Sequence, residues 1–203
     1  VGTFSVSGRQ GAVGGDRALR SVTFRPSVLV QPFPWIAGEL YYSYTESDYP
    51  NPTQTPTALD RDARTRTVGV TAFMPIPTTP VRVEIGAAAI NTSADGTDYD
   101  SSAVQVSARL SSPLVFGIHG ELFISRTRTD YKNANSLAPN AALTAGFAFK
   151  RDDNTQVFAL KFRRHIWENI EGFFQYQDVR NGSNISTFDY RQTVAQIGAT
   201  ARF

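Results

Sequence analysis

Apolar and polar residues alternate along most of this chain, and this period of two limits its possible folds more than any other feature. Successive side chains of a β-strand point to opposite faces, so strict alternation predicts strands with one apolar face. In the stretch 187–203, one side of the extended chain carries Ala195, Ile197, Ala199, Ala201 and Phe203. The other side is polar or glycine, with Val194 as the exception.

Eleven stretches show this alternation and are predicted as strands: 1–9, 19–30, 36–47, 65–75, 81–91, 101–110, 114–126, 141–150, 156–164, 170–177 and 187–203. Segments rich in Pro, Gly, Asn and Asp separate them. The predicted long loops are 48–60, 93–98 and 130–139, and residues 111–113 and 151–154 read as tight turns. No helical period persists over two turns, so the sequence predicts an all-β fold.

The composition limits the class of protein. The 203 residues form one predicted domain, 1–203, in which residues 1–17 are an N-terminal strand or a plug segment. Apolar residues make up 41% without a long run, which excludes a transmembrane helix, and there is no cysteine for a disulfide. The net charge of +2 argues against nucleic acid. Val1 begins without a signal peptide, so an exported protein of this sequence would be the mature form.

Two kinds of barrel fit the alternation. A soluble barrel buries its apolar side chains, whereas a membrane barrel points them at lipid and encloses the polar ones. The apolar faces here are rich in alanine, which fills a soluble core poorly, so we expect the membrane arrangement. The predicted lumen and selectivity residues are Arg25, Glu39, Arg82, Glu84, Arg109, His119, Glu121, Lys161, Arg163 and Glu171.

The end of the sequence resembles that of Gram-negative outer-membrane β-barrels, which are porin-like. Gln196, Gly198, Ala201 and Phe203 match the polar residue, glycine, hydrophobic residue and final aromatic of that family's insertion signal. The last hairpin, with Ser183-Asn184, Asp189-Tyr190-Arg191 and Gly198, is similar to barrels of exopolysaccharide export and surface-lipoprotein assembly.

The resemblance implies an antiparallel transmembrane β-barrel of about 10–12 strands in the bacterial outer membrane. It also implies the partners: the lipid bilayer and lipopolysaccharide, the barrel-assembly machinery and other envelope proteins. Two arguments on orientation conflict. Such barrels carry their long loops outside the cell, yet counting eleven strands back from a periplasmic Phe203 places the long loops in the periplasm.

Few residues suggest chemistry. His119 and Glu121 lie two residues apart on one predicted strand, either as a base or metal element or as an ordinary polar pair in the lumen. His165 is predicted to be solvated beside a turn. Asp95, Asp98 and Asp100 form an acidic loop without the spacing of a known Ca²⁺ motif. We therefore expect no metal, cofactor or catalysis.

The leading hypothesis is a narrow channel or a structural or assembly component of the cell envelope. A barrel of this size has a small lumen, so selectivity would come from the enclosed charges. The alternatives are an integral outer-membrane hydrolase and a soluble, lipocalin-like ligand-binding barrel.

Overall fold

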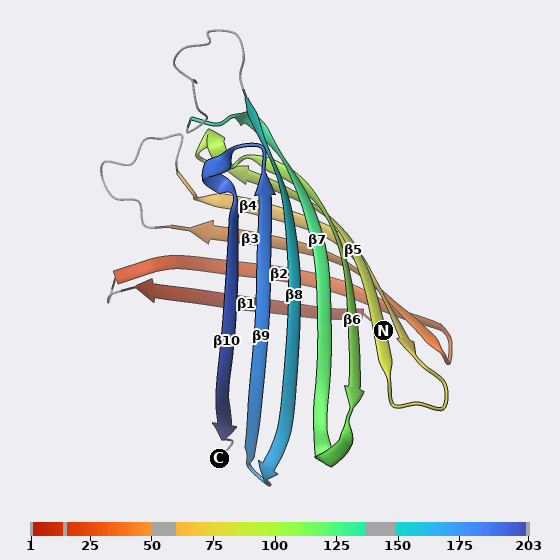
Figure 1. The fold of residues 1–203 in the computed structure, drawn as a ribbon. Helices are drawn as coiled ribbons and strands as arrows, with labels where there is room; N and C mark the ends of the chain where they lie inside the picture. Colours follow the sequence, from red (N-terminus) through yellow and green to blue (C-terminus); the bar gives the residue numbers. More distant parts are fainter. Residues whose placement is uncertain (1, 14–15, 50–59, 137–148, 202–203) are drawn as a thin grey trace.

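The alternating stretches form the strands of one antiparallel sheet. A computed structural model describes residues 2–13, 16–49, 60–136 and 149–201. Within these ranges ten strands follow in chain order, each hydrogen-bonded to its neighbours in sequence (Figure 1). Their bounds are β1 (Gly2–Val13), β2 (Asp16–Phe33), β3 (Ile36–Asp48), β4 (Ala63–Pro75), β5 (Arg82–Ala94), β6 (Ser101–Pro113), β7 (Ile118–Ala134), β8 (Lys150–Trp167), β9 (Ile170–Ser183) and β10 (Tyr190–Ala201).

The predicted all-β, antiparallel architecture is confirmed, but the sheet is not closed into a barrel. Strands β1 and β10 are its two edges, and each pairs with a single neighbour among the described residues. The sheet is strongly twisted, so that β1 to β3 run across the view in Figure 1 and β7 to β10 run down it. Helical structure in the described ranges is limited to the short turns η2 (Thr97–Tyr99), η3 (Val115–Gly117) and η4 (Ser186–Phe188). None of it is long and apolar enough to cross a membrane.

The connections between strands alternate between the two ends of the sheet, and the two longest, 49–62 and 135–149, share one end. Residues 34–35, 76–81, 114–117 and 168–169 connect strands at one end, which we call the turn end. Residues 49–62, 95–100, 135–149 and 184–189 connect them at the other, the loop end. Strand β10 runs from the loop end to the turn end, so Ala201 lies away from the long loops (Figure 1).

The predicted strand 141–150 belongs to the count of eleven on which the conflict between the two orientation arguments rested. Residues 141–148 lie outside the described part of the chain, and Lys150 opens β8. The ten described strands form an even number, so the loop end and the last described residues of β10 are on opposite sides.

Two predicted turns were wrong. The turn expected at 111–113 lies further on: β6 continues to Pro113, and Phe116 and Gly117 turn the chain with φ of 60° and 70°. Residues 151–154, which were expected to form a turn, are part of β8. Their charged side chains form ion pairs with the neighbouring strand β7 and within β8 itself. Asp152 pairs with Arg128 on β7 at 2.9 Å, and Asp153 pairs with Arg151.

The sheet has almost no buried apolar core. Among the described residues, the buried apolar side chains are those of Ala88 and Ile185. Directly paired residues of antiparallel strands share a face, so the register assigns each side chain to one side. One face, the outer face, carries an exposed apolar band: Val22, Phe24, Val28, Val30, Leu40, Tyr42, Val68, Val70, Ile85, Val104, Val106, Ile124, Phe158 and Phe174.

The turn end is apolar as well. Phe33 and Trp35 stack there with ring centroids 5.5 Å apart, although both are more than half exposed. Phe116 is 80% exposed and Trp167 is 71% exposed. Large aromatic side chains at polypeptide turns are unusual in contact with water, and they are typical of a membrane interface.

Candidate functional site: the charged inner face

All ten predicted lumen residues lie on the face opposite the apolar band, which we call the inner face. The register pairs Glu84 with Arg109, Glu121 with Lys161, and His119 with Arg163. A hollow of about 260 Å³ on this face is lined by residues of six strands, β2 to β7.

Two groups of ion pairs border this hollow. Arg25 donates to Glu39 at 3.1 Å, and Glu84 accepts from Arg109 at 3.2 Å while Arg82 lies 3.4 Å away. The glutamate side chains are 17% and 18% exposed, far less than the arginines that cover them. A shielded carboxylate needs such partners, because desolvation of an unpaired charge is costly.

Aromatic rings support the arginines, and the sequence analysis missed them. The guanidinium of Arg25 lies over the Tyr41 ring at 4.2 Å, that of Arg82 over Phe73 at 5.0 Å, and that of Arg109 over Phe123 at 5.5 Å. Each contact contributes about 0.5–2 kcal/mol, depending on its solvation. The feature of the sequence that could have revealed these rings is an aromatic residue on the polar side of an alternating strand.

A glycine makes room for one of these rings. Gly69 is paired with Tyr41, and a Cβ added at Gly69 would overlap the Tyr41 ring. The ring lies across the glycine, where it supports Arg25, which in turn pairs with Glu39. Glycine, tyrosine, arginine and glutamate thus form one continuous unit on the floor of the inner face.

The remaining predicted lumen residues lie closer to the turn end. Glu121 accepts a hydrogen bond from Arg163, while Nε2 of His165 lies 3.7 Å from Glu171. The side chain of His165 is 75% exposed, and that of Glu171 is 26% exposed. His119 is paired in register with Pro113 on one side and with Arg163 on the other, and neither is a nucleophile.

Arg163 also carries a shielded polar group. Its Nε has no hydrogen-bond acceptor among the described residues. Such a group costs about 1–3 kcal/mol unless water reaches it.

A buried cluster covers the loop end of the inner face. Arg151 pairs with Asp153, and its guanidinium lies 3.5 Å from the Phe188 ring centroid and 4.4 Å from that of Tyr131. Burial raises the pKa of Tyr131, which lies beyond the apolar band, to about 12. The cluster joins β7, β8 and η4, and it stays neutral overall because the two charges are paired.

The carboxylates of the acidic loop, which lacks the spacing of a known Ca²⁺ motif, have separate partners. Asp98 is buried and accepts hydrogen bonds from the backbone and hydroxyl of Ser136. Asp100 accepts one from the backbone of Ala94 at 2.7 Å. Both carboxylates therefore hold loops together.

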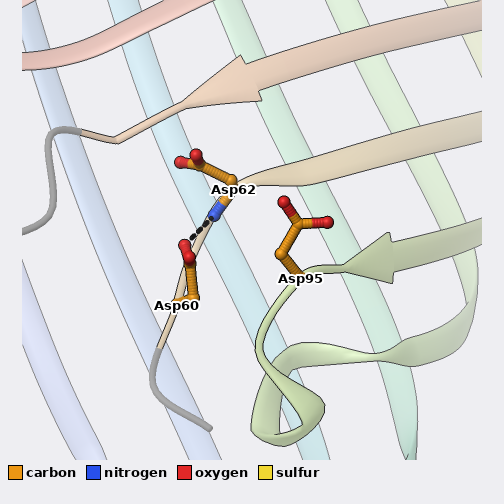
Figure 2. Close-up of side chains that lie close together, drawn as sticks. All are labelled: Asp60, Asp62 and Asp95. Carbon is orange, nitrogen blue, oxygen red and sulfur yellow. Dashed lines mark hydrogen bonds between the residues drawn. The ribbon is translucent and has the colours of Figure 1, made fainter. Parts of the chain in front are cut away.

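Asp95 instead approaches Asp60 and Asp62, with one oxygen of each within 4.8 Å of the others (Figure 2). The Tyr49 N–H donates to Asp62 at 2.6 Å, and the Asp62 N–H donates to Asp60 at 3.0 Å. These backbone donors offset part of the repulsion between the carboxylates. Nothing else at this place indicates a bound ion.

Three of the four predicted insertion-signal residues lie on β10, and Phe203 is outside the described residues. Gln196 pairs in register with Gln175, and Ala201 with Ile170. Gly198 pairs with Phe173, and a Cβ added there would lie 2.8 Å from the Phe173 ring. Gly198 therefore has a packing role on the inner face in addition to the role that the resemblance implies.

No family model, curated protein or solved structure matched this chain in the comparisons made. The functional interpretation consequently rests on the geometry of the two faces.

We expect Gly69→Ala to destabilise the protein by about 1–2 kcal/mol. Displacing the Tyr41 ring lowers the free energy of unfolding by about 1–3 kcal/mol. The smaller conformational entropy of the unfolded alanine variant raises it by up to about 1 kcal/mol. Urea unfolding of the folded protein in detergent measures the difference.

Gly38→Ala is the matched control, because no atom lies within 4 Å of its added Cβ. This variant should be unchanged or slightly more stable. In a Tyr41→Ala background, Gly69→Ala should no longer destabilise. Equal effects of Gly69→Ala and Gly38→Ala would contradict the role assigned to the Tyr41 ring.

Proposed function

We propose that this chain forms the wall of an outer-membrane β-barrel that acts as a narrow, charge-lined channel or as a structural component of the envelope. The exposed apolar band carries this proposal. A sheet of ten strands with two buried apolar side chains in its described part has no core of its own. Covering the band with hydrocarbon supplies the missing apolar environment.

The distribution of polar groups supports the same arrangement. The inner face pairs its charges with one another, as a small hydrated lumen requires. Connections with exposed aromatic residues lie at one end of the sheet, and the two longest connections, 49–62 and 135–149, lie at the other, as is usual in outer-membrane barrels.

Closure of the sheet is part of the proposal. An open sheet edge in hydrocarbon leaves a row of backbone N–H and C=O groups without partners, at a cost of several kcal/mol each. Strands β1 and β10 are antiparallel to each other because nine consecutive antiparallel pairings separate them. We propose that β1 pairs with β10 in the membrane.

Cysteine cross-linking tests this closure in a chain that has no cysteine of its own. Ser5→Cys on β1 is combined in turn with Gln192→Cys, Gln196→Cys and Thr200→Cys on the same face of β10. One combination should give an intramolecular cross-link in the membrane-inserted protein. Thr23→Cys with Thr45→Cys is the positive control, since these residues are paired. Cross-links between two chains, or none at all, would exclude closure within one chain.

Val70→Arg tests whether the outer face meets lipid. Val70 lies at the middle of β4 and is 51% exposed, so the substitution would change stability by less than about 0.5 kcal/mol in water. At the middle of a bilayer, arginine costs about 2–4 kcal/mol. We expect insertion into liposomes, measured by protease protection, to fall sharply.

The control is Ile76→Arg, which changes an apolar residue that is 41% exposed in the β4–β5 connection. Near the interface its cost should be about 0–1 kcal/mol, so insertion should persist. If Val70→Arg inserts as well as Ile76→Arg, or if the refolded chain is soluble without detergent, the membrane proposal fails and the soluble barrel is favoured.

Arg109→Ala tests the channel. The inner set has five Arg and Lys side chains against four Glu, so a weak preference for anions is expected. Removing Arg109 should reduce that preference in planar-bilayer recordings. Arg128→Ala on the outer face should leave selectivity unchanged. Lack of conductance, together with lipid hydrolysis that His119→Ala abolishes, would support the hydrolase instead.

A further inference from the structure

The outer face carries a second feature that the channel does not explain. A depression of about 860 Å³ extends over β6 to β10, and its lining changes from apolar to basic toward the loop end. The apolar part includes Val106, Ile124, Phe158 and Tyr176, and the charged part consists of Arg126, Arg180, Arg191 and Asp178.

A shielded carboxylate holds two of the arginines side by side. Asp178 is 8% exposed and accepts from Arg180 Nε at 3.0 Å, from Arg191 Nε at 2.9 Å and from the Thr193 hydroxyl at 3.1 Å. The arginine side chains remain 59% and 58% exposed. The Nε atoms of both arginines and the Nη2 of Arg191, which donates at 3.3 Å, face Asp178, while more than half of each arginine side chain stays exposed.

The charge of this group is unbalanced. The charged part of the lining contains three arginines and one aspartate, and Arg126 donates to a neutral partner, Asn154, at 2.9 Å. Two other arginines of the outer face have acidic partners. Arg64 lies 3.7 Å from Glu46, and Arg128 lies near both Asp152 and Asp130. Charge complementarity therefore favours binding of an anion at the three arginines beside Asp178.

The apolar neighbours narrow the choice of anion. Asp178 pairs in register with Phe158, and Arg126 with Val106, so the basic group borders the apolar band directly. A free inorganic anion would gain nothing from that contact. An amphiphile would place its acyl chain along the band and its headgroup at the arginines.

We propose that this depression binds the phosphate group of an anionic lipid, with Arg126, Arg180 and Arg191 as donors and Asp178 as the residue that positions two of them. Arginine is suited to this role because its planar guanidinium donates two parallel hydrogen bonds to phosphate oxygens. This inference rests on the proposed function, since it requires lipid on the outer face.

The test uses the full chain inserted in phosphatidylcholine nanodiscs that contain a small fraction of phosphatidic acid. Native mass spectrometry measures how much phosphatidic acid remains bound relative to phosphatidylcholine. The wild type should retain phosphatidic acid preferentially. Arg126→Gln, which leaves Asp178 and its two arginines intact, should weaken that preference about tenfold, as expected for the loss of one charge-assisted contact.

A second variant removes the whole paired group without leaving an isolated charge. Arg180→Gln, Arg191→Gln and Asp178→Asn together should abolish the preference. The control combines Arg64→Gln with Arg128→Gln, which removes two arginines elsewhere on the outer face. Its preference for phosphatidic acid should stay within about twofold of the wild type, well below the tenfold loss expected for Arg126→Gln.

The outcomes separate the two proposals. If the chain inserts but shows no preference for phosphatidic acid, or if the control loses as much preference as the two site variants, the lipid site is overturned and the barrel stands. Displacement of the lipid by inorganic phosphate at equal concentration would also overturn the lipid site. If the chain does not insert into phosphatidylcholine at all, the proposed function itself fails.

Discussion

The structure depends on a continuous ladder of backbone hydrogen bonds between consecutive strands. Nine antiparallel pairings join β1 to β10 in chain order, and no second layer packs against them in the described residues. A water-soluble domain of this size would normally bury a sizeable apolar core. Here the ladder organises the chain, and the side chains divide between a charged face and an apolar face. The proposed membrane location follows from this division.

The charged side chains are arranged differently on the two faces of the sheet. On the inner face, glutamates such as Glu39 and Glu84 are shielded and paired with arginines that lie over aromatic rings. On the outer face, Asp178 holds two arginines beside the apolar band, toward the loop end. The same residue types therefore occur in paired groups on one face and in a basic group on the other, according to the side of the strand on which they lie.

The strands were largely predictable because alternation is a local property. The pairing of Glu84 with Arg109 was not, because it depends on the register between β5 and β6. The errors at 111–117 and 151–154 have the same origin. Phe116 adopts a left-handed conformation that alternation cannot reveal, and the acidic residues near 152 resemble a turn until Arg128 is placed beside them. The ring of Tyr41 was missed because Gly69, which makes room for it, is far away in sequence.

The sequence by itself determined the all-β class, the faces of most strands and the common side of the ten predicted lumen residues. A period of two encodes all of these within single strands. The tertiary structure alone decided the number of described strands, the position of the long loops opposite the end of β10, and the contacts among charges. These depend on register and on connections between strands, and the spacing of residues within one strand contains no information about either.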